Sequence, residues 1–194
     1  MPSHFIRGLI KKSVAFGGIL AGADATIQII QRQAKLRQFE FDWKSLQRHG
    51  LVGSSVIGPL LYSWYYVLDK VLPGARTKTV LLKVACDLII ANLAYYCAFY
   101  YSITFLKNKN HEQAKEVVKN KVAKTYVIGM LYWGPLMAIN FKYLSPQSRV
   151  IFVAIATYIE MNGLCIVSRS SGKKEKEKVL LVEKEKGLLV PVVP

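Results

Sequence analysis

Four polar side chains that could do chemistry lie inside long apolar runs of this chain. They are three carboxylates and one amide: Asp24, Asp87, Glu160 and Asn140. A charged carboxylate at the centre of a lipid bilayer costs at least ~2.5 kcal/mol unless it faces a partner or water. These groups are therefore candidates for lining a path for ions or small solutes, and the alternative is a buried hydrogen-bond network. Lys83 lies one helical turn before Asp87 and is its expected local partner, whereas Glu160 has no basic residue within a turn.

Two of the apolar runs contain a Gly-Pro pair near the middle, Gly58-Pro59 and Gly134-Pro135. Proline in a helix interior removes a hydrogen bond and kinks the helix. In lipid, the freed backbone groups must find protein or trapped water. Broken helices at membrane depth are common in channels and transporters. We therefore expect helix breaks at both pairs, and the alternative is a proline inside a soluble core helix.

The composition indicates a membrane protein. Hydrophobic residues make up 52% of the 194 residues, yet the formal net charge is +15, and the charges are segregated from the apolar runs. Runs long enough to span a bilayer cover residues 13–30, 50–68, 80–106, 125–143 and 149–168. We predict an all-α, polytopic membrane helix bundle of four or five spans over residues 1–168. A charged and disordered tail should follow over residues 169–194.

Two segments leave the number of spans open. Residues 13–30 are the most polar run, which either crosses the membrane or lies partly in the interface. In this run Gly18 and Gly22 predict a small-residue face for close helix packing, and Asp24 has Arg32 two turns away. Residues 108–124 carry few apolar residues among many lysines. They predict a short amphipathic helix on the membrane surface, with a solvated loop as the alternative.

Several classes of function are disfavoured by the sequence. The three histidines are scattered in polar segments, and the three cysteines lie in apolar runs without a CxxC pair. The HExxH, GxSxG and phosphate-loop patterns are absent. Basic residues flank the spans and do not form one patch, which disfavours nucleic acid as a partner. We therefore expect no enzyme, no metal site and no cofactor.

The two Gly-Pro runs begin similar segments. Arg76 and Arg149 each follow a proline by three residues, and Asp87 and Glu160 each lie eleven residues after their arginine. Eleven helical residues rise about 16 Å, so both acids would lie near the bilayer centre. The pattern predicts two parallel helix hairpins, and chance similarity between apolar segments is the alternative.

The chain resembles a known family over residues 6–167. The motifs that carry the resemblance are Ala23-Asp24, Gly58-Pro59, Trp64-Tyr65-x-Val67-Leu68-Asp69, Pro73-Gly74, Asp87, Trp133, Asn140-Phe141 and Arg149. They are similar to the signatures of the Mpv-seventeen type family, to which the 22-kilodalton peroxisomal membrane protein belongs. The chain departs from the family pattern at four positions: Gly134 separates Trp133 from Pro135, Met137 stands where glutamine is usual, Pro146 is shifted by one, and Glu160 stands where an aromatic residue is usual.

The resemblance implies an integral protein of the mitochondrial inner membrane or the peroxisomal membrane. It also implies a non-selective channel for small solutes, with roles in organelle homeostasis and mitochondrial DNA maintenance. The departures at Met137 and Glu160 place any inherited pore chemistry in question. The first 22 residues are basic and contain no acid, which favours a mitochondrial targeting helix. A basic flank that orients the first span is the alternative.

Three functions remain open at this stage. The first is a channel or pore for small solutes or ions, with the lipid bilayer as the surrounding partner and homo-oligomers left open. The second is a structural or assembly membrane protein without a pore. The third is a transporter that depends on Asp87 or Glu160. A water-filled path past these acids would favour the first or third, and a dry bundle would favour the second.

Overall fold

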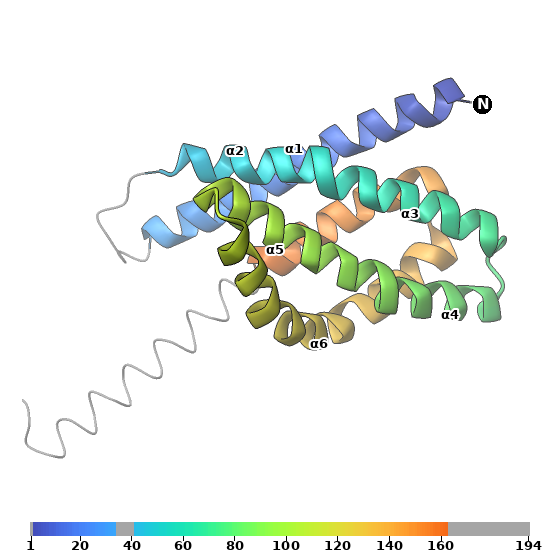
Figure 1. Ribbon diagram of the computed structural model, residues 1–194. Coiled ribbons are helices and arrows are strands. Elements are labelled where there is room, and N and C mark those ends of the chain that lie inside the picture. The colour runs from blue at the N-terminus through green and yellow to red at the C-terminus, as the bar shows by residue number, and fades with distance from the viewer. Residues whose placement is uncertain (1, 34–40, 163–194) are drawn as a thin grey trace, which may run out of the picture.

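The computed structural model describes residues 2–33 and 41–162, and this part of the chain contains helices and no strand (Figure 1). The helices are α1 (Pro2–Gln33), α2 (Trp43–Val52), α3 (Gly58–Val71), α4 (Thr77–Cys86), α5 (Asn92–Asn108) and α6 (His111–Tyr143). A last helical segment covers residues 146–162. The predicted all-α bundle is confirmed. The tail predicted for residues 169–194 and the end of the last span lie outside the described residues.

Two π-helical turns join helices into longer rods. Gly53–Ile57 connects α2 to α3, and Asp87–Ala91 connects α4 to α5. Among the described residues, four continuous helices are long and apolar enough to cross a membrane: His4–Arg32, Trp43–Val71, Thr77–Asn108 and His111–Tyr143. The most polar run, residues 13–30, therefore lies within a helix of spanning length.

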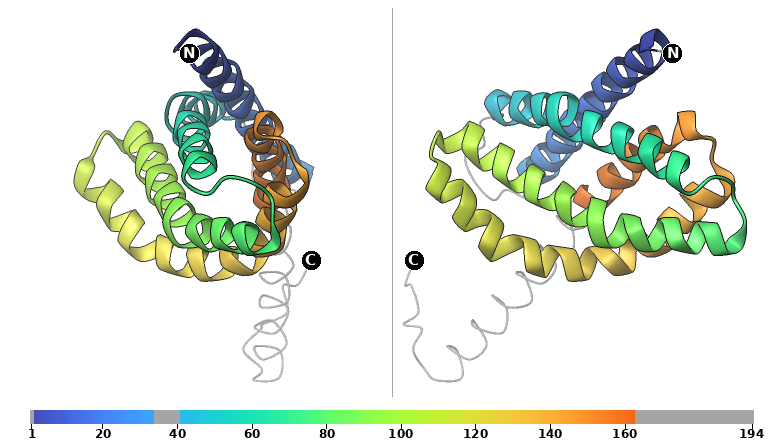
Figure 2. Two further views of the ribbon diagram at one scale, coloured as in Figure 1. Left: turned by 90° about the vertical axis from the view of Figure 1, so that its right-hand side faces the viewer. Right: turned by 45° about the vertical axis from the view of Figure 1, so that its right-hand side comes forward.

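The helices surround a common centre. Seen end-on, α3, the α4–α5 rod, α6 and the last helical segment lie around it, and α1 crosses the outside of the α2–α3 rod (Figure 2). Apolar side chains from these helices form one core, which includes Phe16, Leu61, Tyr95, Trp133 and Val153.

The expectation for residues 108–124 is corrected by the structure. They are neither a separate surface helix nor a loop, because α6 runs without interruption from His111 to Tyr143. The turn before α6 is tight: Lys109 adopts a left-handed conformation with φ 53°, and the Asn110 side chain accepts a hydrogen bond from the backbone N–H of Gln113 at 3.1 Å. Two residues thus reverse the chain, so α5 and α6 pack as an antiparallel pair.

The close packing of α1 uses a different glycine from the predicted pair. Gly18 and Gly22 have open space where a side chain would stand. Gly17, one residue away on the buried face, lies against the α2–α3 rod: a Cβ on Gly17 would lie 2.6 Å from the carbonyl oxygen of Gly50. A Cβ on Gly53 would lie 2.8 Å from the Cα of Gly17. Backbone therefore meets backbone at this crossing.

Replacing Gly17 by alanine should lower the free energy of unfolding by roughly 1–3 kcal/mol, because the added methyl group forces the helices apart. Gly18→Ala is the matched control, since no atom lies within 4 Å of its Cβ position. We expect that control to be neutral or slightly stabilising. Denaturant unfolding of both variants in the same detergent measures the difference, and equal losses would contradict the assigned crossing.

Candidate functional site

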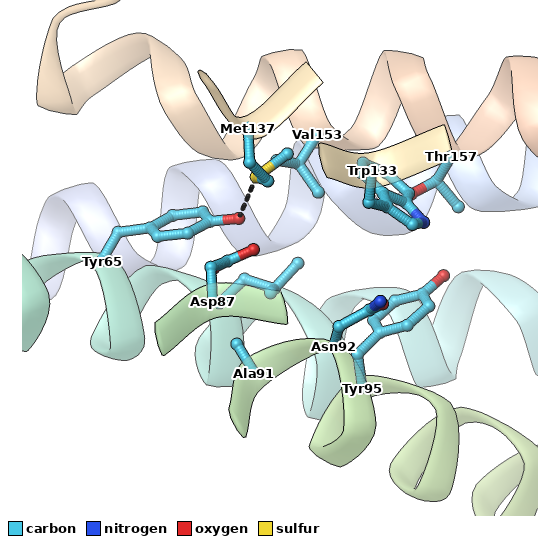
Figure 3. A pocket seen from close by; sticks show the side chains of 10 residues that line it. Tyr65, Asp87, Ala91, Asn92, Tyr95, Trp133, Met137, Val153 and Thr157 are labelled. Carbon is cyan, nitrogen blue, oxygen red and sulfur yellow. Dashed lines mark hydrogen bonds between the residues drawn. The ribbon is translucent and has the colours of Figure 1, made fainter. Parts of the chain in front are cut away.

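A small cavity with several polar groups in a mostly apolar wall lies at the centre of the bundle, where α3, the second π-helical turn, α5, α6 and the last helical segment meet (Figure 3). Its lining residues are Leu61, Tyr65, Asp87, Ala91, Asn92, Tyr95, Trp133, Met137, Val153 and Thr157. The cavity volume is about 20 Å³, which is room for one water molecule. Its wall contains a carboxylate, an amide, a threonine hydroxyl and two phenols, and no basic residue.

Asp87 is the acidic residue of this wall. It begins the π-helical turn Asp87–Ala91, and only 5% of its surface is exposed. The indole N–H of Trp64 donates a hydrogen bond to its Oδ1 at 2.9 Å. π-Helical turns inside α-helices are frequent at functional sites. The helix is thus locally widened at the buried carboxylate. Sequence periodicity alone does not predict this widening.

Other polar atoms of the cavity have hydrogen-bonding capacity to spare. The Nδ2 of Asn92 and the Oγ1 of Thr157 are buried and have no hydrogen-bond partner among the described residues. Leaving such a group unsatisfied costs about 1–3 kcal/mol. The cavity therefore suits a guest that both accepts and donates hydrogen bonds, as water and small polar solutes do.

Met137 occupies one side of the cavity and connects it to Asn140. The hydroxyl of Tyr65 donates to the sulfur of Met137 at 3.7 Å (Figure 3), and the Nδ2 of Asn140 donates to the same sulfur at 3.7 Å. Asn140 is fully buried, and its Oδ1 has no partner within the described chain. It lies behind the cavity wall and is not one of the lining residues.

Glu160 lies beside the cavity and not in its wall. The hydroxyl of Tyr96 donates to the Oε1 of Glu160 at 2.9 Å, and the indole N–H of Trp133 donates to the Tyr96 hydroxyl at 3.2 Å. Trp133 itself lines the cavity. Glu160 is thus connected to the cavity through two aromatic side chains.

Asp24 belongs to a separate polar network that joins α1 to α2. It accepts hydrogen bonds from the Nε2 of Gln28 at 2.7 Å and from the hydroxyl of Ser45 at 3.0 Å, and the Nδ1 of His49 lies 3.2 Å from its Oδ1. Arg32, the expected neighbour, is exposed and is not among these partners. Asp24 therefore does not meet the other three candidates.

The expected pairing of Lys83 with Asp87 is also corrected. The Nζ of Lys83 lies 2.7 Å from the Oδ1 of Asp69, and it also donates to the carbonyl of Gly74 at 3.2 Å. Arg149 pairs with the other oxygen of Asp69. Lys83 and Arg149 are 1% and 5% exposed. We call Asp69, Lys83 and Arg149 the ion cluster.

The ion cluster was not predicted from the sequence, although two signals for it were present. Asp69 and Arg149 belong to the motifs that carry the family resemblance, and no apolar role explains either residue. Phe141, from the same motifs, lies under both cations, 5.9 Å from the Nζ of Lys83 and 5.2 Å from the Cζ of Arg149. The motif residues therefore converge on this cluster.

The two Gly-Pro pairs are accommodated in different ways. Gly58 and Pro59 start α3 directly after the π-helical turn Gly53–Ile57, so that the helix continues through the pair. Gly58 also provides space, because a Cβ there would lie 2.6 Å from the Cα of Ser13 in α1. Gly134 and Pro135 lie inside α6, which continues to Tyr143. The predicted breaks thus take the form of one widened turn and one proline within a continuous helix.

Comparisons with known proteins agree with the motifs. The sequence profile described as the Mpv17 / PMP22 family matches residues 104–159. "PXMP2/4 family protein 4" of Dictyostelium discoideum is 26% identical over 158 residues, covering 79% of this chain and 85% of that protein. "Mpv17-like protein" of Bos taurus is 27% identical over 150 residues, covering 77% and 72%. These comparisons support membership of the Mpv17 / PMP22 family.

The names of further relatives bear on the location of this chain. "Mitochondrial inner membrane protein Mpv17" of Drosophila melanogaster is 22% identical over 145 residues, covering 69% of this chain and 83% of that protein. These names support the mitochondrial inner membrane as the location, and the PXMP2/4 names fit the peroxisomal alternative. No solved structure matches the chain.

Proposed function

We propose that this organellar membrane protein is a channel or pore for small solutes that contributes to organelle homeostasis. The observation that carries the proposal is the central cavity, in which buried Asp87, Asn92 and Thr157 meet. Buried polar atoms without partners are costly in a dry helix bundle, and a permeating polar solute or water would satisfy them.

In this proposal, the structure corresponds to the closed conformation of the pore. Its volume of about 20 Å³ admits water, so larger solutes require the helices to separate. We propose that the π-helical turn Asp87–Ala91 is the wall that moves, because a shift to regular α-helix would rotate Asp87 relative to α5. The wall contains an acid and no basic residue, which favours cations and neutral polar solutes over anions.

Conductance in planar bilayers tests the pore. We expect Asp87→Asn to shift the reversal potential in a salt gradient toward lower cation selectivity, because asparagine cannot carry the negative charge of a carboxylate. Glu160→Lys should shift it in the same direction. Glu112→Gln is the control, since Glu112 is exposed and pairs with Lys115 on the protein surface.

An unchanged reversal potential in folded Asp87→Asn protein would remove Asp87 from the pore. If the wild-type protein is folded and conducts nothing, the structural or assembly role becomes the better interpretation, and the small cavity volume favours that role. Solute uptake that is driven by a pH gradient and lost in Asp87→Asn would instead indicate a carboxylate-dependent transporter.

A further inference from the structure

A second hollow opens on the surface between α3 and the last helical segment, at the end of the bundle that holds the ion cluster. We call it the tyrosine groove. Its lining residues are Tyr62, Tyr65, Tyr66, Asp69, Lys70, Pro146, Gln147 and Val150. Its volume is about 340 Å³, far larger than that of the central cavity.

The charge around this groove is not balanced. The ion cluster contains two buried cations and one carboxylate, so its formal charge is +1. Lys70 adds a further positive charge at the groove, with its Nζ 5.3 Å from the centre of the Tyr66 ring. The Nε of Arg149 is buried and has no hydrogen-bond partner within the described chain. Asp69, which lines the groove, is already bonded to both cations.

Backbone groups increase the positive potential at the same place. Pro146 and Gln147 line the groove and begin the last helical segment. Pro146 has no N–H, and the N–H of Ser148 donates to the carbonyl of Ser145 at 2.9 Å. In this first turn, the N–H of Gln147 and the helix dipole are therefore the backbone contributions that favour an anion. The aromatic walls formed by Tyr62 and Tyr66 are apolar over most of their surface. The groove thus combines a positive end with an apolar wall.

We propose that the tyrosine groove binds an anionic phospholipid, with the phosphate beside Lys70 and Gln147 and the acyl chain along the tyrosine wall. A phosphodiester carries a negative charge, which would balance the net positive charge of the ion cluster and Lys70. Basic pockets between membrane helices bind anionic headgroups in this manner. The groove lies between the α2–α3 rod, a candidate span, and the last helical segment, so a lipid can reach it laterally. A water-soluble anion does not need such access. This inference does not depend on whether the central cavity conducts.

Native mass spectrometry and thermal unfolding of the full chain test the site. Protein in neutral detergent is titrated with phosphatidylglycerol, with phosphatidylcholine and, separately, with inorganic phosphate. We expect phosphatidylglycerol to bind and to raise Tm, whereas the other two have little effect. Lys70→Gln should weaken this binding roughly fivefold, and Gln147→Glu should weaken it at least as much because it adds a negative charge at the groove.

Lys78→Gln is the matched control, because Lys78 is an exposed lysine near the same end of the bundle and does not line the groove. Both groove residues that are changed are exposed, so the variants should fold. Equal binding of phosphatidylcholine, or equal weakening by Lys78→Gln, would overturn the proposal in favour of unspecific lipid contact. A Tm increase with inorganic phosphate as large as that with phosphatidylglycerol would overturn it in favour of a site for soluble phosphate.

Discussion

Replacing Asp69 by asparagine is expected to lower the free energy of unfolding by roughly 3 kcal/mol, the lower end of the range for breaking a buried ion pair. The substitution leaves Lys83 and Arg149, whose side chains are 2% and 6% exposed, without their shared counter-charge. We use the lower end because the Asp69 side chain is itself 23% exposed. Unfolding of the purified protein in mixed micelles measures the loss.

The control for this prediction is an ion pair of similar length in an exposed position. Lys115 and Glu112 lie 2.8 Å apart with side chains that are 65% and 81% exposed, so Glu112→Gln should change the stability by well under 1 kcal/mol. The double variant Asp69→Asn/Lys83→Met should recover part of the loss, because it removes one of the two uncompensated charges. A loss below about 1 kcal/mol for Asp69→Asn would show that the ion cluster is not a main stabilising contact.

Gly129→Ala is expected to cost roughly 2–3 kcal/mol and to disconnect Glu160 from the core. A Cβ on Gly129 would lie 2.3 Å from the Tyr96 hydroxyl and 3.1 Å from its ring. Tyr96 is 4% exposed and cannot rotate away into solvent. Its displacement would break the bonds to Glu160 and from Trp133. Unfolding measurements and the tryptophan fluorescence spectrum report the two effects.

A double-variant cycle separates the clash from other causes. Tyr96→Phe removes the hydroxyl that lies nearest the added methyl group, so Gly129→Ala should cost less in that background than in the wild type. Gly18→Ala is again the matched control, since it makes the same change where space is open. Identical costs in both backgrounds would contradict the assigned contact.

The helices were predictable because membrane-length apolar runs leave few alternatives to a helix. All four candidate spans of the described chain contain one of the predicted runs. Residues 108–124 were harder to interpret. Their lysines favour an aqueous environment, which suggested a segment separate from the span that follows. In the structure these residues form the first turns of α6. Composition alone therefore does not show where that helix begins.

The partners of the charged residues were less predictable than the helices. The sequence places Lys83 one turn before Asp87, and local spacing favours that pair. The turn between α3 and α4 instead brings Asp69 within 2.7 Å of Lys83. The choice of Gly17 over Gly18 has a similar origin. Neighbouring helix residues point about 100° apart, and only the position of the α2–α3 rod decides which of them is buried.

The central cavity could be predicted only in part. Asp87 was identified as a buried carboxylate, but its hydrogen bond with Trp64 and the π-helical turn depend on tertiary packing. Asn92 and Thr157 were not among the candidates, because neither carries a carboxylate and, unlike Asn140, neither belongs to the motifs that carry the family resemblance. The parallel repeat of two hairpins stays a prediction.

The ion cluster has a consequence for the order in which the chain enters its membrane. Asp69 and Lys83 lie on adjacent helices that are synthesised together, so this hairpin can be inserted as a mutually neutralised pair. Arg149 arrives only with the last helix and must find a carboxylate that is already in place. Because Arg149 is inserted after Asp69 is already in place, we expect the final helix to dock onto a partly assembled protein. A chain truncated before this helix should therefore still insert into the membrane. Because its assembly is incomplete, membrane quality-control proteases should degrade it.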